Sequence, residues 1–190
     1  MNAHAVWAWT DRAGLEHCIV RSSIDGVDVD GLVVVDWDGV PLEVRYQFRC
    51  DRSWRFVGAH VRAVRGNDAR AIMIDRPSRD TWRIDGELAP HLAGCDDVDL
   101  MASPFTNTLP VRRLALKTAK PQRLDVAWIR LPDLDVVRAR QEYERLDSTS
   151  NPFARRVLFR SVDSGFTAEL DLDRDGLVID YPPYWKRRGV

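Results

Sequence analysis

The chain has 190 residues, of which 45% are hydrophobic and 30% charged, and its 28 basic and 29 acidic residues leave a formal net charge of −1. This composition is typical of a folded globular protein and argues against intrinsic disorder. The balanced, interleaved charge argues against nucleic-acid partners, whose phosphates require a basic excess. We expect a single domain over residues 1–190, because a chain of this length buries about 70% of its unfolded surface in one core.

The cysteines and the apolar runs indicate a cellular location. Cys18, Cys50 and Cys95 are odd in number and form no CxxC pair, which favours buried free thiols over a disulfide framework. The first residues lack the basic and apolar regions of a signal peptide, and no apolar run approaches the roughly 18 residues that a membrane helix needs. These features predict a cytoplasmic protein without an integral membrane segment.

Alternation of apolar and polar residues runs through most of the chain. Residues 42–50 are the clearest case, with apolar side chains at every even position. Residues 54–64 alternate similarly, so Trp54, Phe56 and His60 are predicted to share one face, and residues 123–131 and 166–172 continue the pattern. A period of two is typical of strands with one buried face. The sequence therefore predicts a mainly β protein.

Glycine pairs mark the expected turns between these strands. Asp-Gly and Ser-Gly pairs tolerate the positive φ angles of tight hairpins. They occur at residues 25–26, 30–31, 38–39, 85–86, 164–165 and 175–176, and a Gly-Asn turn is expected at 65–68. Their spacing predicts an antiparallel meander. Residues 136–146 are ambiguous: their composition favours a helix and their alternation a strand, which the neighbouring strands make our preference.

The best helix candidate is the segment from Ser103 to Leu114. Ser103 followed by Pro104 is typical of an N-cap and first helical position. Pro110 should kink this helix or restart it, because proline lacks the backbone N–H of a helix interior. Phe105, Leu109 and Leu114 recur near helical spacing and are expected to anchor the segment in the core.

Two segments superficially resemble metal sites. Residues 171–176 begin like an EF-hand loop, but Pro182 occupies the position of the essential bidentate glutamate, so a hairpin is the better interpretation. Residues 91–99 gather one histidine, one cysteine and three aspartates in an order that matches no zinc spacing. We therefore predict no metal and no cofactor. No catalytic motif is present either, so we assign no catalytic residues.

Several blocks of the chain resemble a known family in order and spacing. They are residues 80–86 (DTWRIDG), 94–100 (GCDDVDL), 103–114 (SPFTNTLPVRRL) and 173–182 (DRDGLVIDYP), followed by Trp185 and Arg187. Together they resemble the bacterial family of putative glycolipid-binding proteins over nearly the whole chain. The resemblance implies a spiral β-roll, in which a long antiparallel sheet wraps around a single α-helix. It also implies a homodimer and a non-enzymatic role in binding an amphipathic, glycolipid-like ligand.

Candidate ligand-binding residues follow from this picture. They are Trp82, Asn107, Arg112, Arg113, Tyr143 and Tyr181. In one interpretation the two arginines pair with Asp85, Asp97 or Asp99 and stabilise the roll, because buried charges are normally paired. In the other they contact a sugar or an anionic headgroup. Several of the seven tryptophans, if they point inward, are expected to line an apolar cavity.

Two other functions remain open from the sequence. A dimeric structural or interaction protein without a small-molecule ligand is the main alternative, and it predicts a solid core and an apolar dimer surface. A hydrolase is the third hypothesis, since catalytic triads assemble in space and leave no contiguous motif.

Overall fold

The computed structural model describes residues 2–114, 120–146 and 155–189. The first half of the chain is a run of antiparallel strands joined by hairpins. These strands are β1 (Asn2–Trp9), β2 (Gly14–Ser22), β3 (Val27–Trp37), β4 (Val40–Cys50), β5 (Phe56–Arg65), β6 (Asp68–Ser78), β7 (Thr81–Ile84) and β8 (Glu87–Leu88).

The second half begins with the helical segments and continues as strands. A 3₁₀ turn η1 (Pro90–Leu92) precedes β9 (Asp97–Leu100), and a second 3₁₀ turn η2 (Pro104–Asn107) leads directly into the helix α1 (Thr108–Leu114). The remaining strands are β10 (Gln122–Ile129), β11 (Val136–Leu146), β12 (Arg155–Ser161), β13 (Thr167–Leu172), β14 (Val178–Tyr181) and β15 (Trp185–Arg188).

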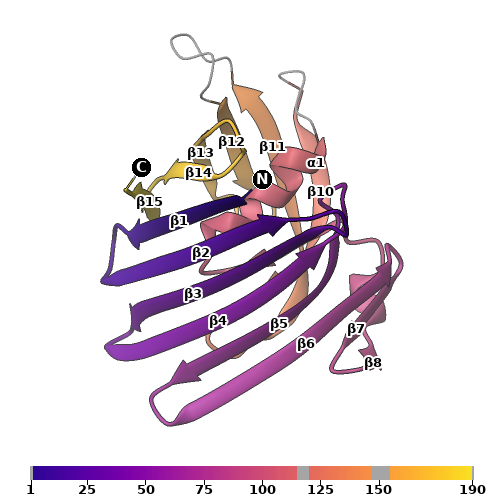
Figure 1. Cartoon of the computed structure of the whole chain (residues 1–190), viewed down its shortest axis with the longest axis horizontal. Helices are drawn as coiled ribbons and strands as arrows, with labels where there is room; N and C mark the ends of the chain where they lie inside the picture. Colours follow the sequence, from indigo (N-terminus) through magenta and orange to yellow (C-terminus); the bar gives the residue numbers. More distant parts are fainter. Residues whose placement is uncertain (1, 115–119, 147–154, 190) are drawn as a thin grey trace.

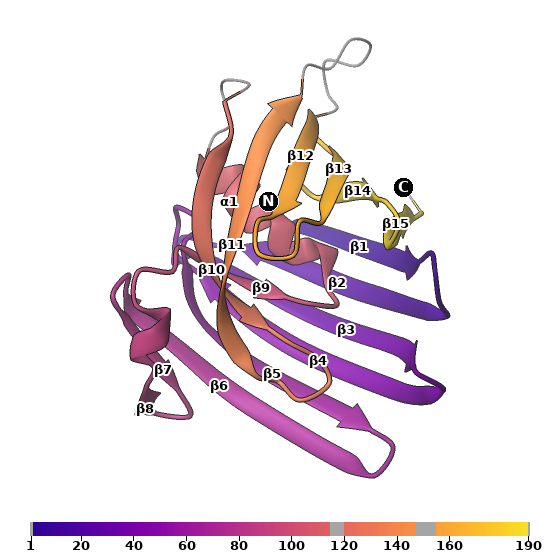
Figure 2. The same cartoon turned by 180° about the vertical axis from the view of Figure 1, so that it is seen from behind.

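All the described strands belong to one 15-stranded sheet, in the order β8-β7-β6-β5-β4-β3-β2-β1-β15-β14-β13-β12-β11-β10-β9. The first and last strands pair with each other, so Trp9 lies opposite Trp185. The sheet curls so that β1–β6 form one wall and β10–β13 another, with η2 and α1 between them (Figure 1; Figure 2 gives the view from behind). The predicted β-roll around a single α-helix is confirmed.

The alternation of residues 42–50 is confirmed by burial. Leu42, Val44, Tyr46 and Phe48 point into the roll and are at most 2% exposed, while the intervening residues face outward or are only partly covered. Burying these side chains contributes roughly 1.5–3 kcal/mol each. The inner face of β1–β6, together with Phe105 and Leu109 from the helical segment, forms the main apolar core. Most inward side chains of β10–β13 form a second apolar cluster with Val111 of α1.

The predicted turn at residues 30–31 is wrong. Asp30 and Gly31 lie within β3, and Gly31 is the cross-strand partner of Tyr46. A Cβ atom on Gly31 would lie only 1.9 Å from Cζ of Tyr46, so the glycine is required for the Tyr46 ring to cover the backbone of β3. The other predicted turns connect strands, as expected.

The face predicted for residues 54–64 is also wrong in part. Phe56 points inward, but His60 is exposed on the outer face, whereas Ala59 and Val61 are buried. The pairing of β4 with β5 shifts register between Arg49 and Cys50. Such a bulge moves every following side chain to the opposite face of the sheet, and no alternation pattern reveals it.

The helical segment begins after the predicted N-cap Ser103, and it restarts as an α-helix close to Pro110, as predicted. The Ser103 hydroxyl accepts a 3.2 Å hydrogen bond from the backbone N–H of Phe105, which caps η2. The 3₁₀ turn gives way to α1 at Thr108, so Pro110 falls within the first turn of the α-helix, where its missing N–H costs nothing. Residues 136–146, which were ambiguous, form the strand β11. No described helix is long and apolar enough to cross a membrane.

Candidate ligand cleft

A cleft of about 650 Å³ opens at one end of the roll, a size typical of small-molecule sites. Hairpin turns alternate between the two ends of an antiparallel sheet, and four that share this end contribute to the cleft. Arg12 comes from the β1–β2 turn, Asp38 from the β3–β4 turn, Ser164 from the β12–β13 turn and Tyr184 from the β14–β15 turn. The mouth therefore gathers side chains that are far apart in sequence.

One wall of the cleft consists of three tryptophans from neighbouring parts of the sheet. The rings of Trp9 and Trp185 lie 4.5 Å apart between centroids, and Trp37 meets Trp9 edge-on at 6.2 Å. The guanidinium of Arg12 lies 4.8 Å from the Trp9 ring centroid and 5.2 Å from that of Trp37, at the mouth. The Trp9 indole N–H is buried without an acceptor among the described residues, so this wall retains an unused hydrogen-bond donor.

The facing wall is a second aromatic cluster. Phe159, Phe166, Tyr181 and Tyr184 contact one another with ring centroids 5.4–6.4 Å apart. Trp128 from β10 adds another ring to the lining. Aromatic faces carry partial negative charge and a large apolar area, so they suit both hydrocarbon and the C–H faces of a sugar ring.

The floor between these walls is polar and centres on Asp99 of β9. Its Oδ1 accepts a 2.7 Å hydrogen bond from the Thr106 hydroxyl, and its Oδ2 accepts a 2.7 Å bond from the Gln141 amide. Burial raises the pKa of Asp99, while these two hydrogen bonds oppose that rise. Both oxygens of Asp99 therefore have a donor group within hydrogen-bond distance. No described lysine or arginine forms an ion pair with it.

A second carboxyl group lies in the core beside the floor. Glu16 of β2 is 0% exposed, and the hydroxyl groups of Tyr46 and Ser103 both donate to its Oε1. Burial raises the pKa of Glu16 to about 8. Its Oε2 has no hydrogen-bond partner among the described residues. Ser103 also lines the cleft, so its hydroxyl group links the Glu16 carboxyl group to the floor.

Two of the predicted site residues, Asn107 and Tyr181, line the cleft. Tyr143 lies just behind the lining: its hydroxyl is 2.8 Å from Oδ1 of Asn107 and 3.2 Å from Oε1 of Gln141, and it is 1% exposed. Burial raises the pKa of Tyr143 well above its usual value. Tyr143 therefore supports the polar floor without facing the open space.

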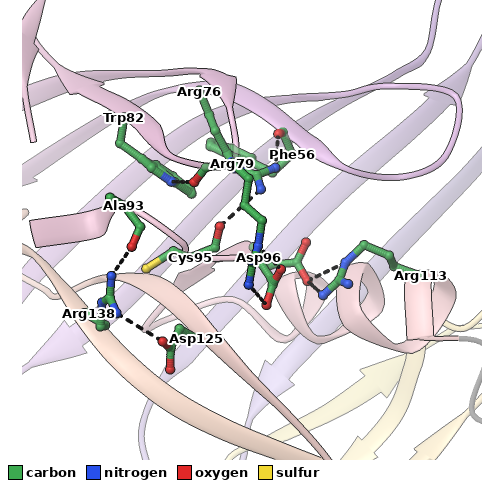
Figure 3. A network of polar contacts seen from close by, with 11 residues as sticks. Phe56, Arg76, Arg79, Trp82, Ala93, Cys95, Asp96, Arg113, Asp125 and Arg138 are labelled. Carbon is green, nitrogen blue, oxygen red and sulfur yellow. Dashed lines mark hydrogen bonds and ion pairs between the residues drawn. The ribbon is translucent and has the colours of Figure 1, made fainter. Parts of the chain in front are cut away.

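Trp82 and Arg113 belong to a polar network at the other end of the roll (Figure 3). Trp82 stacks on Phe56 at 5.6 Å between centroids and donates to the carbonyl of Arg79. Arg113 forms an ion pair of 2.7 Å with Asp97, whose side chain is 0% exposed. Burial raises the pKa of Asp97 and the guanidinium opposes that rise. Neither Trp82 nor Arg113 is among the residues that line the cleft.

Arg112 also lies outside the cleft lining. Its guanidinium is 4.1 Å from the Trp54 ring centroid and donates to the backbone carbonyl of Asp175. Burial lowers the pKa of Arg112. Of the aspartate partners that the sequence offered, Asp97 pairs with Arg113. Arg112 contacts the Asp175 carbonyl and the Trp54 ring instead.

Most of the lining was not identified from the sequence. The unassigned members include all the other aromatic residues of the lining, together with Asp99 and Gln141: Trp9, Trp37, Trp128, Phe159, Phe166, Tyr184 and Trp185. The number of tryptophans did indicate that some line a cavity, and four of the seven do. Which tryptophans line the cleft depends on which face of the sheet each side chain occupies and on the pairing of the first strand with the last. Neither is encoded in a local motif.

A long sheet rolled around a helical segment, with an aromatic cleft at one end, defines the protein as a helix-enclosing β-roll. The chain belongs to the Putative glycolipid-binding family, whose model matches residues 4–187. The family resemblance seen in the sequence is thereby confirmed. No curated protein matches the chain significantly.

Two solved structures share the fold. A DUF1089 family protein from Pseudomonas aeruginosa is 30% identical and has a TM-score of 0.80, over 91% of this chain and 92% of that one. A β-barrel-like protein of the domain of unknown function DUF1849 from Brucella abortus has a TM-score of 0.62 over 98% of this chain and 94% of that one. At 12% identity, the second likeness concerns the fold alone.

Proposed function

We propose that this protein binds an amphipathic, glycolipid-like ligand, without catalysing a reaction, in the aromatic cleft at the end of the roll. The observation that carries the proposal is the combination of two aromatic walls with a polar floor in one cleft of about 650 Å³. Binding sites for small organic ligands typically join a large apolar lining to a few convergent polar groups. The family name supports the same class of ligand.

The two kinds of surface suit the two parts of such a ligand. The tryptophan wall and the Phe159–Phe166 wall offer aromatic faces to an acyl chain or to the C–H face of a sugar. The floor offers the Asp99 carboxylate and the Gln141 and Asn107 amides to hydroxyl groups. A purely apolar ligand would displace water from these floor groups and leave their remaining hydrogen-bonding capacity unused, which is costly.

The direct test is mass spectrometry of organic extracts from the protein purified out of its own host. The matched experiment fills the cleft by Ala139→Trp, because Ala139 lies in the lining on β11. Ala71→Trp, on the exposed outer face of β6, is the control for adding a tryptophan. We expect wild type and Ala71→Trp to retain an amphipathic lipid and Ala139→Trp to lose it.

Extracts free of lipid from all three proteins would contradict the proposal. So would equal retention by the correctly folded Ala139→Trp variant, because the lipid would then be bound elsewhere. Circular dichroism and the melting temperature establish that each variant is folded.

One observation favours the alternative of a dimeric interaction protein. Leu15 and Val34 are cross-strand partners on the outer face of β2 and β3, and they are 54% and 48% exposed. Adjacent exposed apolar side chains are common at protein interfaces. Sedimentation equilibrium of wild type and Leu15→Glu tests this: a dimer through this face would dissociate in the variant, and a dimer that persists would not use it.

A further inference from the structure

The charges that line the cleft are unevenly distributed. Among the described lining residues, arginine is represented by Arg12 alone and aspartate by Asp38, Asp99 and Asp163. Arg12 lies over two tryptophan rings at the mouth and 3.6 Å from Asp11. The space between the aromatic walls therefore has an excess of negative charge.

The floor contains an accessible carboxyl group with spare accepting capacity. Asp99 is partly exposed, and each of its oxygens accepts one hydrogen bond, from Thr106 or from Gln141. A carboxylate oxygen has two lone-pair sites, so each can accept a further bond from a ligand. Asp163 differs, because Arg140 forms an ion pair with it at 2.7 Å. Asp99 is thus the lining carboxylate best placed to bind a donor at the floor.

We infer that the polar end of the ligand is an uncharged sugar and that Asp99 determines this specificity by accepting hydrogen bonds from its hydroxyl groups, an inference that rests on the proposed function. A phosphate or sulfate head would carry its charge toward the Asp99 carboxyl group in a cleft lined by aromatic rings, which screen charge less than bulk water does. Repulsion between like charges is strong in such surroundings. A sugar hydroxyl instead forms a charge-assisted bond with the carboxylate.

The test uses three amphiphiles with the same tail: octyl glucoside, octyl phosphate and octyltrimethylammonium, each as a monomer below its micelle concentration. Calorimetry gives the affinities. Tryptophan fluorescence reports on the cleft, because Trp9, Trp37, Trp128 and Trp185 line it. We expect octyl glucoside to bind at least about tenfold more tightly than the other two.

The matched variants are Asp99→Asn and Asp28→Asn, which remove the same charge from the floor and from the exposed outer face of β3. We expect Asp99→Asn to weaken octyl glucoside by at least about tenfold and to reduce the preference over octyl phosphate. Asp28→Asn should bind like wild type, because Asp28 is not among the residues that line the cleft. The order of affinities in wild type decides the inference even if Asp99→Asn does not fold.

The outcomes separate this inference from the proposed function. Tightest binding of octyl phosphate, or an unchanged affinity of Asp99→Asn for octyl glucoside, overturns the inference and leaves an amphiphile-binding cleft. Tightest binding of octyltrimethylammonium also overturns it and identifies an aromatic cage for cations. If none of the three binds saturably, the proposed function fails together with the inference.

Discussion

The Ser103 hydroxyl donates a 2.6 Å hydrogen bond to the buried carboxyl group of Glu16, across 87 positions of the chain. Ser103 also caps η2 and lines the cleft, so one hydroxyl group joins the helical segment, the wall of the roll and the candidate site. Glu16 meets only hydroxyl donors there, and burial raises its pKa to about 8. Near neutral pH this carboxyl group is therefore mostly protonated in the folded protein.

Glu16 should make the stability of the fold depend on pH. Its pKa rises from an ordinary value of 4.5 to about 8 on folding. The free energy of unfolding is therefore highest below pH 4.5. It falls above that value, because Glu16 ionises in the unfolded chain before it ionises in the folded protein, and it levels off above about pH 8. The free energy of unfolding falls by at most about 5 kcal/mol over this interval. Urea unfolding across this interval measures it.

The variant Glu16→Gln should abolish this dependence, because the amide preserves the acceptor for Ser103 without titrating. Glu43→Gln is the control, since Glu43 lies on the outer side of β4 in an ion pair with Arg45. A Glu16→Gln protein that loses stability in parallel with wild type across the same pH interval would show that Glu16 is not the responsible group.

The helical segment should be an anchor of the core. Leu109 is 0% exposed, and Leu109→Ala should reduce the free energy of unfolding by about 2–5 kcal/mol. Leu114 is only partly buried, in contrast to the expectation from the sequence, so Leu114→Ala should cost roughly half of that or less. Chemical denaturation of both variants checks the difference. If Leu109→Ala unfolds at the same urea concentration as wild type, the enclosed helix does not support the roll.

The two neighbouring arginines should differ in their contribution to stability. Arg113→Met leaves the buried Asp97 carboxylate without its ion pair, which should cost about 3–5 kcal/mol. Arg112→Met loses a hydrogen bond to a carbonyl and a cation–π contact, and should cost about 1–3 kcal/mol. Melting temperatures and denaturation curves measure both.

A double variant tests the cause of the Arg113 effect. Asp97→Asn combined with Arg113→Met removes the unpaired charge and should recover part of the lost stability. Neither arginine lines the cleft, so both single variants should retain ligand when folded. Selective loss of ligand from a folded variant would instead assign that arginine to binding.

Calcium should neither bind to nor stabilise the loop after β13. Oδ1 of Asp173 accepts hydrogen bonds of 2.9 Å from the backbone N–H groups of Asp175 and Leu177, and its Oδ2 binds Arg187 at 2.6 Å. The carboxylate thus holds a hairpin turn. Isothermal titration should give no calcium signal, and Asp173→Ala should lower the melting temperature with or without calcium. Micromolar binding that Asp173→Ala abolishes would contradict this.

The local chemistry of the chain determined the strands, most of the turns and the helix. Residues 42–50 alternate strictly because one face of β4 is buried, and Ser103 with Pro104 starts η2 because it can cap it. These effects act within a few residues, so the sequence displays them directly. The spiral arrangement itself came from the family resemblance and not from periodicity.

Other features were decided only by the tertiary structure. The bulge opposite Arg49 reverses the faces of β5, and Gly31 lies in mid-strand because the Tyr46 ring needs its space. The cleft exists because β1 pairs with β15, which brings Trp9 beside Trp185 at distant positions of the chain. A wall built from both chain ends has no local signature, because its residues become neighbours only when the sheet closes on itself.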